Sequence, residues 1–249
     1  HLMGVVPLPR DYDVSKYRLD ALKCMKVIIK KGKVPIFAGG TGLYMSILID
    51  GIFTEKAGNE KIREKLYSQA RKHGQDSIHK RLQQADPVSA VKIHPHDIKR
   101  MVRALEVFLA TGKPISSLQA QRKGLGQEDY DVRIFCLDRE RETLCKKIDT
   151  RVERMFDEGL EEEARNILKS KLSKTARFAI GLREMKGYFE GQYGIEEAKR
   201  LIKRNTRQYA KRQLTWFRKD PRIRWVNIGD KEKLSTVAER ILTYIYDGK

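Results

Sequence analysis

The segment TRQYAKRQLTWFR, residues 206–218, combines side chains suited to holding a nucleic acid. It places Arg207, Lys211, Arg212 and Arg218 on one predicted helix, with Trp216 near its end. Residues 199–219 contain nine Lys or Arg and no Asp or Glu. A solvated helix normally mixes charges, because opposite charges four residues apart stabilise it. The run therefore favours a phosphate backbone as its counter-ion. The alternative is a basic surface helix with no specific partner.

A second candidate is the turn Gly39-Gly40-Thr41. It follows the apolar run VPIFA (34–38), which predicts a buried strand, and it precedes a predicted helix over 43–49. Glycines let a ligand approach the backbone closely, and a helix N-terminus offers free N–H groups. The turn either cradles a ligand or is an ordinary tight connection. It is not a P-loop, because the chain contains no GxxxxGK[ST] signature.

Three further segments carry residues that could bind an anion. In the predicted helix over 96–111, Lys99, Arg100 and Arg103 offer a phosphate grip, or else belong to a solvated face. The segment FAIGLR (178–183) places a glycine at a helix start, where another chain can approach closely. Arg151 stands among residues of both charges, so an ordinary paired surface is its alternative role.

Composition limits the classes of function. The 249 residues carry a net charge of +19 and a pI near 9.8, which favours nucleic acid and, less often, an anionic membrane as partner. No apolar run approaches the roughly 20 residues that span a bilayer, and the N-terminus has no signal-peptide layout. The three cysteines and five histidines lack metal-ligand spacing, which predicts reduced thiols and no metal site.

The order of predicted elements indicates an α/β protein with a helical insertion. A helix capped by Asp13 or Ser15 runs to about residue 31, and a strand is expected over 132–137, followed by helices over 141–156 and 161–169. Residues 53–126 are polar and helix-rich, with candidate helices over 59–73, 76–85, 87–92, 96–111 and 116–121. The chain is therefore divided into a first core part (1–52), a helical insertion domain (53–126) and a second core part with the basic helix (127–249).

Taken together, these segments resemble the tRNA dimethylallyltransferases, also called tRNA isopentenylpyrophosphate transferases. The resemblance rests on PIFAGGTGLYMSILIDGI (35–52), HPHDIKRMVRALEVFLATGKP (94–114), IDTRVERMFDEGL (148–160), FAIGLREM (178–185) and TRQYAKRQLTWFR (206–218). It implies a P-loop-NTPase-like parallel-sheet core and the transfer of a dimethylallyl group from its diphosphate to N6 of the adenosine 3′-adjacent to the anticodon. It further implies Mg²⁺, whose main site is expected in the P-loop segment that these 249 residues lack. The other implied properties are a nucleotide-binding core, a tRNA partner, a monomer and a cytoplasmic location.

The resemblance also implies roles for individual residues. Thr41 and Arg151 are expected to be catalytic, and Thr41 also to contact the target adenosine. Diphosphate contacts are expected from Gly39, Gly40, Arg151 and Arg207. Contacts with the tRNA anticodon stem-loop are expected from Lys99, Arg100, Met101, Val102 and Arg103; from Phe178, Ala179, Ile180, Gly181, Leu182 and Arg183; and from Lys211, Arg212, Gln213, Leu214, Thr215, Trp216, Phe217 and Arg218.

The sequence departs from the family pattern at two places. Leu182 stands where the family usually has tyrosine. The opening residues, HLMGVVPLPRDY, resemble family sequence downstream of both the P-loop and the aspartate that is the expected general base. The 249 residues alone are therefore expected to grip tRNA but to be inactive in transfer. The alternative function is a non-enzymatic RNA-binding protein derived from the same fold.

Overall fold

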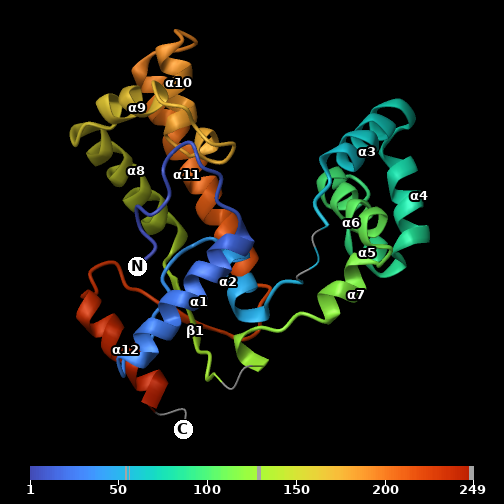
Figure 1. Ribbon diagram of the computed structural model, residues 1–249. Coiled ribbons are helices and arrows are strands. Elements are labelled where there is room, and N and C mark those ends of the chain that lie inside the picture. Colours follow the sequence, from blue (N-terminus) through green and yellow to red (C-terminus); the bar gives the residue numbers. More distant parts are fainter. Residues whose placement is uncertain (54, 56, 128–129, 247–249) are drawn as a thin grey trace. The chain divides into compact units, whose positions relative to one another are not determined.

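The computed structural model describes residues 1–53, 55, 57–127 and 130–246 (Figure 1). The chain divides into two compact units. Unit 1 consists of His1–Met45 and Asp131–Lys249, and unit 2 of Ser46–Tyr130.

Most of unit 1 is helical. Its elements are α1 (Val14–Lys30), the first turn of α2 (Gly42–Asp50), β1 (Ile134–Asp138), α8 (Arg141–Asp157), α9 (Leu160–Leu168), the short 3₁₀ helix η2 (Ala176–Phe178), α10 (Leu182–Phe189), α11 (Ile195–Phe217), β2 (Ile223–Asn227) and α12 (Leu234–Tyr246). Asp13 caps α1 by accepting the Lys16 N–H, as a short acidic side chain does at this position. The predicted helix over 206–218 is confirmed as the second half of α11.

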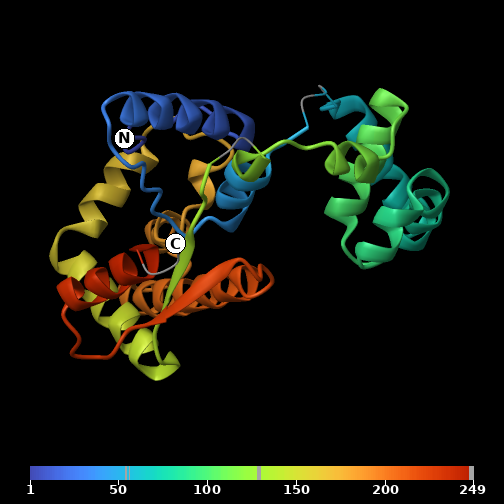
Figure 2. The same cartoon turned by 90° about the horizontal axis from the view of Figure 1, so that it is seen from below.

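The sheet of unit 1 is a parallel pair. β1 and β2 run side by side with Ile134 opposite Ile223 and Asp138 opposite Asn227, and both strands can be followed in Figure 2. Parallel strands need a long crossover, and here α8 to α11 supply it. These four helices share an apolar core, made of Val152, Leu160, Ala164, Met185, Ala198 and Ile202. The crossover therefore fixes α11 against α8 and α10.

The predicted buried strand over 34–38 is wrong. Its backbone belongs to no strand among the described residues, and the side chains of Val34 and Ile36 are 82% and 87% exposed. A strand needs a hydrogen-bonded neighbour, and the two described strands pair only with each other. The segment therefore reaches the Gly39–Thr41 turn as an exposed, unpaired stretch.

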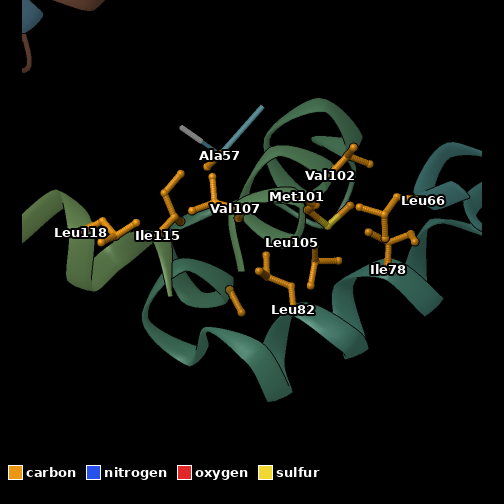
Figure 3. Packing of buried hydrophobic residues seen from close by; sticks show 12 residues of the cluster. Ala57, Leu66, Ile78, Leu82, Met101, Val102, Leu105, Val107, Ile115 and Leu118 are labelled. Atoms are coloured by element: carbon orange, nitrogen blue, oxygen red, sulfur yellow. The ribbon is translucent and has the colours of Figure 1, made fainter. Parts of the chain in front are cut away.

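Unit 2 is built from helices. They are the last part of α2, then α3 (Glu60–His73), α4 (Gln75–Ala85), α5 (Pro87–Lys92), α6 (Ile98–Thr111), α7 (Ile115–Ala120) and the 3₁₀ helix η1 (Leu125–Gln127). Figure 3 shows the apolar core, in which Met101 and Leu105 of α6 face Leu66 of α3 and the α4 residues Ile78 and Leu82. Gly112 ends α6 in the left-handed conformation that glycine adopts most easily.

Two buried carboxylates tie the helices of unit 2 together. Asp86 caps α5 and accepts hydrogen bonds from Ser89 and from Ser116 at the start of α7. Glu106 of α6 is 0% exposed and accepts from the Asn59 N–H and from Arg63 and Arg103. Burial opposes ionisation, but the hydrogen bonds outweigh it and hold the pKa of both carboxyl groups below the ordinary value.

In the described part of the chain, no helix is both long and apolar enough to span a membrane.

Candidate functional site

The Gly39–Thr41 turn lies directly against the C-terminal end of α11. The Gln213 amide donates a hydrogen bond of 2.9 Å to the Gly40 carbonyl oxygen. A Cβ atom added to Gly40 would overlap the Gln213 amide, and one added to Gly42 would overlap the Trp216 indole ring. The absence of side chains at both glycines is therefore what lets the basic helix reach the turn.

A pocket of about 380 Å³ opens at this turn. It is lined by Gly39, Gly40, Thr41, the rings of Tyr12, Tyr17 and Tyr44, and apolar residues that include Val5, Val6 and Met45. The rings of Tyr17 and Tyr44 stack with centroids 4.3 Å apart. Burial and the neighbouring Asp20 carboxylate raise the pKa of Tyr12 to about 12, so its ring stays neutral at physiological pH. No lysine or arginine is among the lining residues.

Replacing Gly42 with alanine is expected to lower the free energy of unfolding by about 1–3 kcal/mol, because the new methyl group overlaps the rigid Trp216 ring. Gly39→Ala is the matched control, since its Cβ would lie 3.7 Å from the Met45 Cε, an ordinary contact. Urea unfolding followed by tryptophan fluorescence measures both variants. Equal stability of the two variants would show that α11 does not pack on the turn.

The positive charge of α11 is partly neutralised inside unit 1. Lys199 and Lys203 pair with Glu153 of α8, and Arg207 binds Asp149 at 2.5 and 2.7 Å. Arg218 lies 3.9 Å from Asp138 at the end of β1. Acidic side chains of the same unit are therefore the counter-ions for part of this run. Four cations on or just after α11 form no salt bridge with an acid among the described residues, namely Arg204, Lys211, Arg212 and Lys219, although the charge of Arg204 still acts on Glu197.

Arg151 lies exposed on α8 and is not among the residues that line the pocket. It has no acidic partner in the described part of the chain. Arg207 differs, because both Asp149 oxygens already accept from its guanidinium. Of the two arginines expected at the diphosphate, Arg151 is the one whose charge is available.

The loop over 178–183 is held by a buried carboxylate. Glu184 accepts the Gly181 N–H at 2.8 Å and the Asn205 amide of α11 at 2.6 Å. Gly181 has a φ of +99°, which glycine adopts without strain. This arrangement leaves Phe178 69% exposed, whereas Leu182 packs half-buried against the core of α8 to α11. Phe178 and Arg183 are thus available at the surface, and Leu182 serves mainly as packing.

In unit 2, some side chains of the segment over 99–103 lie at the surface and others lie in the apolar core. Met101 and Val102 are completely buried in the core of Figure 3, so contact of their side chains with an RNA is excluded in this structure. Arg103 donates to Glu106 and to the Ala57 carbonyl. Lys99 and Arg100 are exposed, and Arg100 pairs with Asp97. A grip by this segment therefore depends on Lys99 and Arg100.

The resemblance implies Mg²⁺, and the donor groups of the structure test this. Among the described residues, no three His, Cys, Asp or Glu side chains gather in a group that could hold a metal ion. Mg²⁺ is usually held by one or two carboxylates together with waters and substrate phosphates, so the described residues assign no site to it and no chemical step is derived through one.

Three features of the site escape sequence reasoning. The stacked tyrosines come from segments 27 residues apart in the sequence, numbered 17 and 44. The contacts of Gln213 with Gly40 and of Glu184 with Asn205 join residues that no local pattern connects. The sequence offers one chemical signal for them: the uncharged amides of Asn205 and Gln213 stand within a run of cations.

Comparison with known proteins agrees with this architecture. The sequence model of the family described as IPP transferase matches residues 1–220. A tRNA dimethylallyltransferase of Geobacter sulfurreducens is 42% identical over 241 residues, which cover 96% of this chain and 77% of the relative. The structure resembles the full-length tRNA isopentenylpyrophosphate transferase of Bacillus halodurans (TM-score 0.67, 31% identity, 98% of this chain and 76% of that one). It also resembles a eukaryotic dimethylallyltransferase acting on tRNA, with a TM-score of 0.79 and 26% identity. That match covers 99% of this chain and 64% of the other one.

The fold and the site, with these likenesses, define a prenyltransferase with an α/β core of the P-loop-NTPase-like kind. The chain belongs to the IPP transferase family, since the family model covers most of its length. It spans about three quarters of the length of the curated relatives that it matches.

Proposed function

We propose that this chain acts in tRNA modification, in the transfer of a dimethylallyl group from dimethylallyl diphosphate to N6 of the adenosine 3′-adjacent to the anticodon. The observation that carries the proposal is the contact of α11 with the Gly39–Thr41 turn. A helix with exposed cations and aromatic rings is fixed beside a pocket that could hold a small apolar group. The names of the relatives support the same reaction.

This reaction requires a surface that binds an extruded base and the RNA backbone, and the exposed aromatic rings and cations of unit 1 meet that requirement. The target adenine must leave its stack, which costs a few kcal/mol and least for an unpaired loop base. Proteins that recognise RNA loops offer aromatic and arginine planes on which extruded bases stack. Phe178 is largely exposed, and Trp216 is 43% exposed beside the turn. Arg204, Lys211 and Arg212 supply charge for the RNA backbone.

The pocket suits the prenyl end of the donor better than its diphosphate. Its lining is aromatic and apolar, with neutral tyrosine rings and no cationic side chain. The allylic carbon gains positive charge as the diphosphate leaves, and the face of an aromatic ring attracts a cation. We therefore assign the binding of the dimethylallyl group to the three tyrosine rings of the pocket. Thr41 is assigned to the end of the pocket where the transfer takes place, and Arg151 to the binding of the diphosphate.

The proposal extends to the chain taken alone. No P-loop signature occurs in these 249 residues, and the resemblance assigns the cradle for the diphosphate to that motif. These residues by themselves should bind tRNA with little transfer, as monomers acting in the cytoplasm. The competing function is RNA binding without catalysis, which the same experiment addresses.

The test is a gel shift with an anticodon stem-loop that carries adenosine next to the anticodon. Arg212→Ala should weaken binding about 3- to 10-fold by removing one phosphate contact. Thr41→Ala should leave binding within about twofold, because a role at the reacting atom contributes little to the grip. Equal weakening by both variants would refute this division of roles.

The bound RNA is then incubated with dimethylallyl diphosphate, and its nucleosides are examined by mass spectrometry. Absence of RNA binding would overturn the proposed function. Trace transfer that depends on Thr41 would exclude RNA binding without catalysis. Transfer at many turnovers per minute would contradict the expectation for the chain alone.

A further inference from the structure

One helix supports both candidate catalytic segments. Near its middle, α11 holds Asp149 of α8 through Arg207, two residues before Arg151. Six residues further along, it holds the Gly40 carbonyl through Gln213. The exposed cations Lys211 and Arg212 immediately precede Gln213. A ligand seated on the exposed face of α11 therefore acts next to the contact that holds the turn.

The Gln213 contact controls the peptide plane that precedes Thr41. The carbonyl of Gly40 and the N–H of Thr41 belong to the same planar peptide group, so fixing one atom fixes the orientation of the other. The Thr41 carbonyl in turn accepts the N–H groups of Tyr44 and Met45, at 2.9 and 3.2 Å, and so begins α2. Gln213 thus sets the direction of the backbone on which the Thr41 hydroxyl stands.

Gln213 also differs from its neighbours in what it offers a ligand. Its side chain is only half exposed, and one of its two amide N–H groups is already donated to the Gly40 carbonyl. Lys211 and Arg212 are exposed and pair with no acid among the described residues. The resemblance implies a tRNA contact for Gln213 as well, but the structure gives its amide an internal partner, so we assign the RNA contact to Lys211 and Arg212 instead.

We propose that Gln213 is a positioning residue that couples RNA occupancy of α11 to the conformation of the Gly39–Thr41 turn. RNA bound to the exposed face of α11 restricts the motion of its C-terminal end. Because the Gln213 amide is hydrogen-bonded to the Gly40 carbonyl, the motion of the Gly40–Thr41 peptide is then restricted as well. The inference rests on the proposed function, because RNA is taken as the ligand of α11.

The test measures amide hydrogen exchange at Tyr44 and Met45, with and without saturating anticodon stem-loop. In the wild-type chain, RNA should slow this exchange by at least about fivefold. Gln213→Ala should bind RNA within about threefold of wild type, with the protection reduced below about twofold. Gln213→Glu keeps the size but lacks the donor, so it should behave like the alanine variant. Gln208→Ala, on an exposed part of the same helix, is the matched control and should retain the full protection.

The outcomes separate the two claims. Failure of the wild-type chain to bind RNA overturns the proposed function and this coupling with it. RNA binding with the same protection in wild type and Gln213→Ala overturns the coupling alone. A loss of RNA affinity beyond tenfold in Gln213→Ala, with a turn that never responds to RNA, would instead make Gln213 a direct RNA contact.

Discussion

Replacing Arg63 and Arg103 together with methionine is expected to lower the free energy of unfolding of unit 2 by about 3–5 kcal/mol, because it leaves a buried carboxylate without a cation. Glu106 is completely buried, and its charge is met by these two arginines and the Asn59 N–H. Methionine keeps most of the side-chain length, so the loss is mainly electrostatic. Hydrogen exchange of the α6 amides in the whole chain measures the stability of this unit.

Two further variants make the first prediction specific. Adding Glu106→Gln to the double variant should recover part of the loss, since a neutral amide costs less to bury than a charge. Lys61→Met with Lys65→Met removes the same charge from exposed positions of α3 and should change stability by less than about 1 kcal/mol. A double variant of Arg63 and Arg103 no less stable than this control would disprove the role of the ion pairs.

The dependence on pH has a definite sign. The folded-state pKa of Glu106 lies below its ordinary value, so its stabilisation is complete above the unfolded pKa of about 4.3 and is lost as pH falls through the folded pKa. Without the arginines, burial raises the pKa instead. Acidification should then relieve the destabilisation of the double variant, the reverse of the wild-type trend.

The affinity for an anticodon stem-loop is expected to fall on the order of 10²- to 10³-fold between 50 and 200 mM salt, which corresponds to about six phosphate contacts. Six exposed cations that we assign to this contact form no salt bridge in the described part of the chain. Five lie in or next to the segments expected to contact tRNA (Lys99, Arg183, Lys211, Arg212 and Lys219), and Arg204 lies earlier on α11. The cations of α11 that bind Glu153 and Asp149 are not counted, because their charge is already met.

Double alanine variants test which cations contribute to the salt dependence of RNA binding. Lys211→Ala with Arg212→Ala should reduce the magnitude of the salt slope by roughly 1.5, because two fewer counter-ions are released. Lys26→Ala with Lys30→Ala removes the same charge from exposed positions of α1 and should leave the slope nearly unchanged. An affinity insensitive to salt, or the same slope in both pairs, would contradict a phosphate grip by α11.

Local signals in the sequence predict the helices well but not the strand pairing. Asp13 and Asp97 cap α1 and α6 by contacts within three residues, which the sequence displays directly. The apolar run over 34–38 shows that the segment could bury one face, but not whether a neighbouring strand is present. β2 was not predicted, because Arg224 interrupts its short apolar run and its partner β1 lies about 90 residues earlier.

The sequence predicts which charged residues the candidate site contains, but it does not predict which of them contact one another. The cations of α11 and the glycine turn follow from residue type. Whether a cation is free depends on distant residues, as Arg207 with Asp149 and Arg103 with Glu106 show. Burial of Met101 follows from the apolar side of its helix, whereas the resemblance assigned the whole segment to RNA contact.

The exposed stretch over 34–38 has a consequence for handling the protein. An unpaired stretch with exposed apolar side chains, here Val34 and Ile36, is a site onto which another chain can add a strand. Pro35 withholds one N–H from such pairing, and the net charge of +19 keeps copies apart. Salt shortens the range of that repulsion from about 10 Å at 0.1 M to about 3 Å at 1 M. The high-salt washes that strip nucleic acid from a basic protein thus also remove its main colloidal protection.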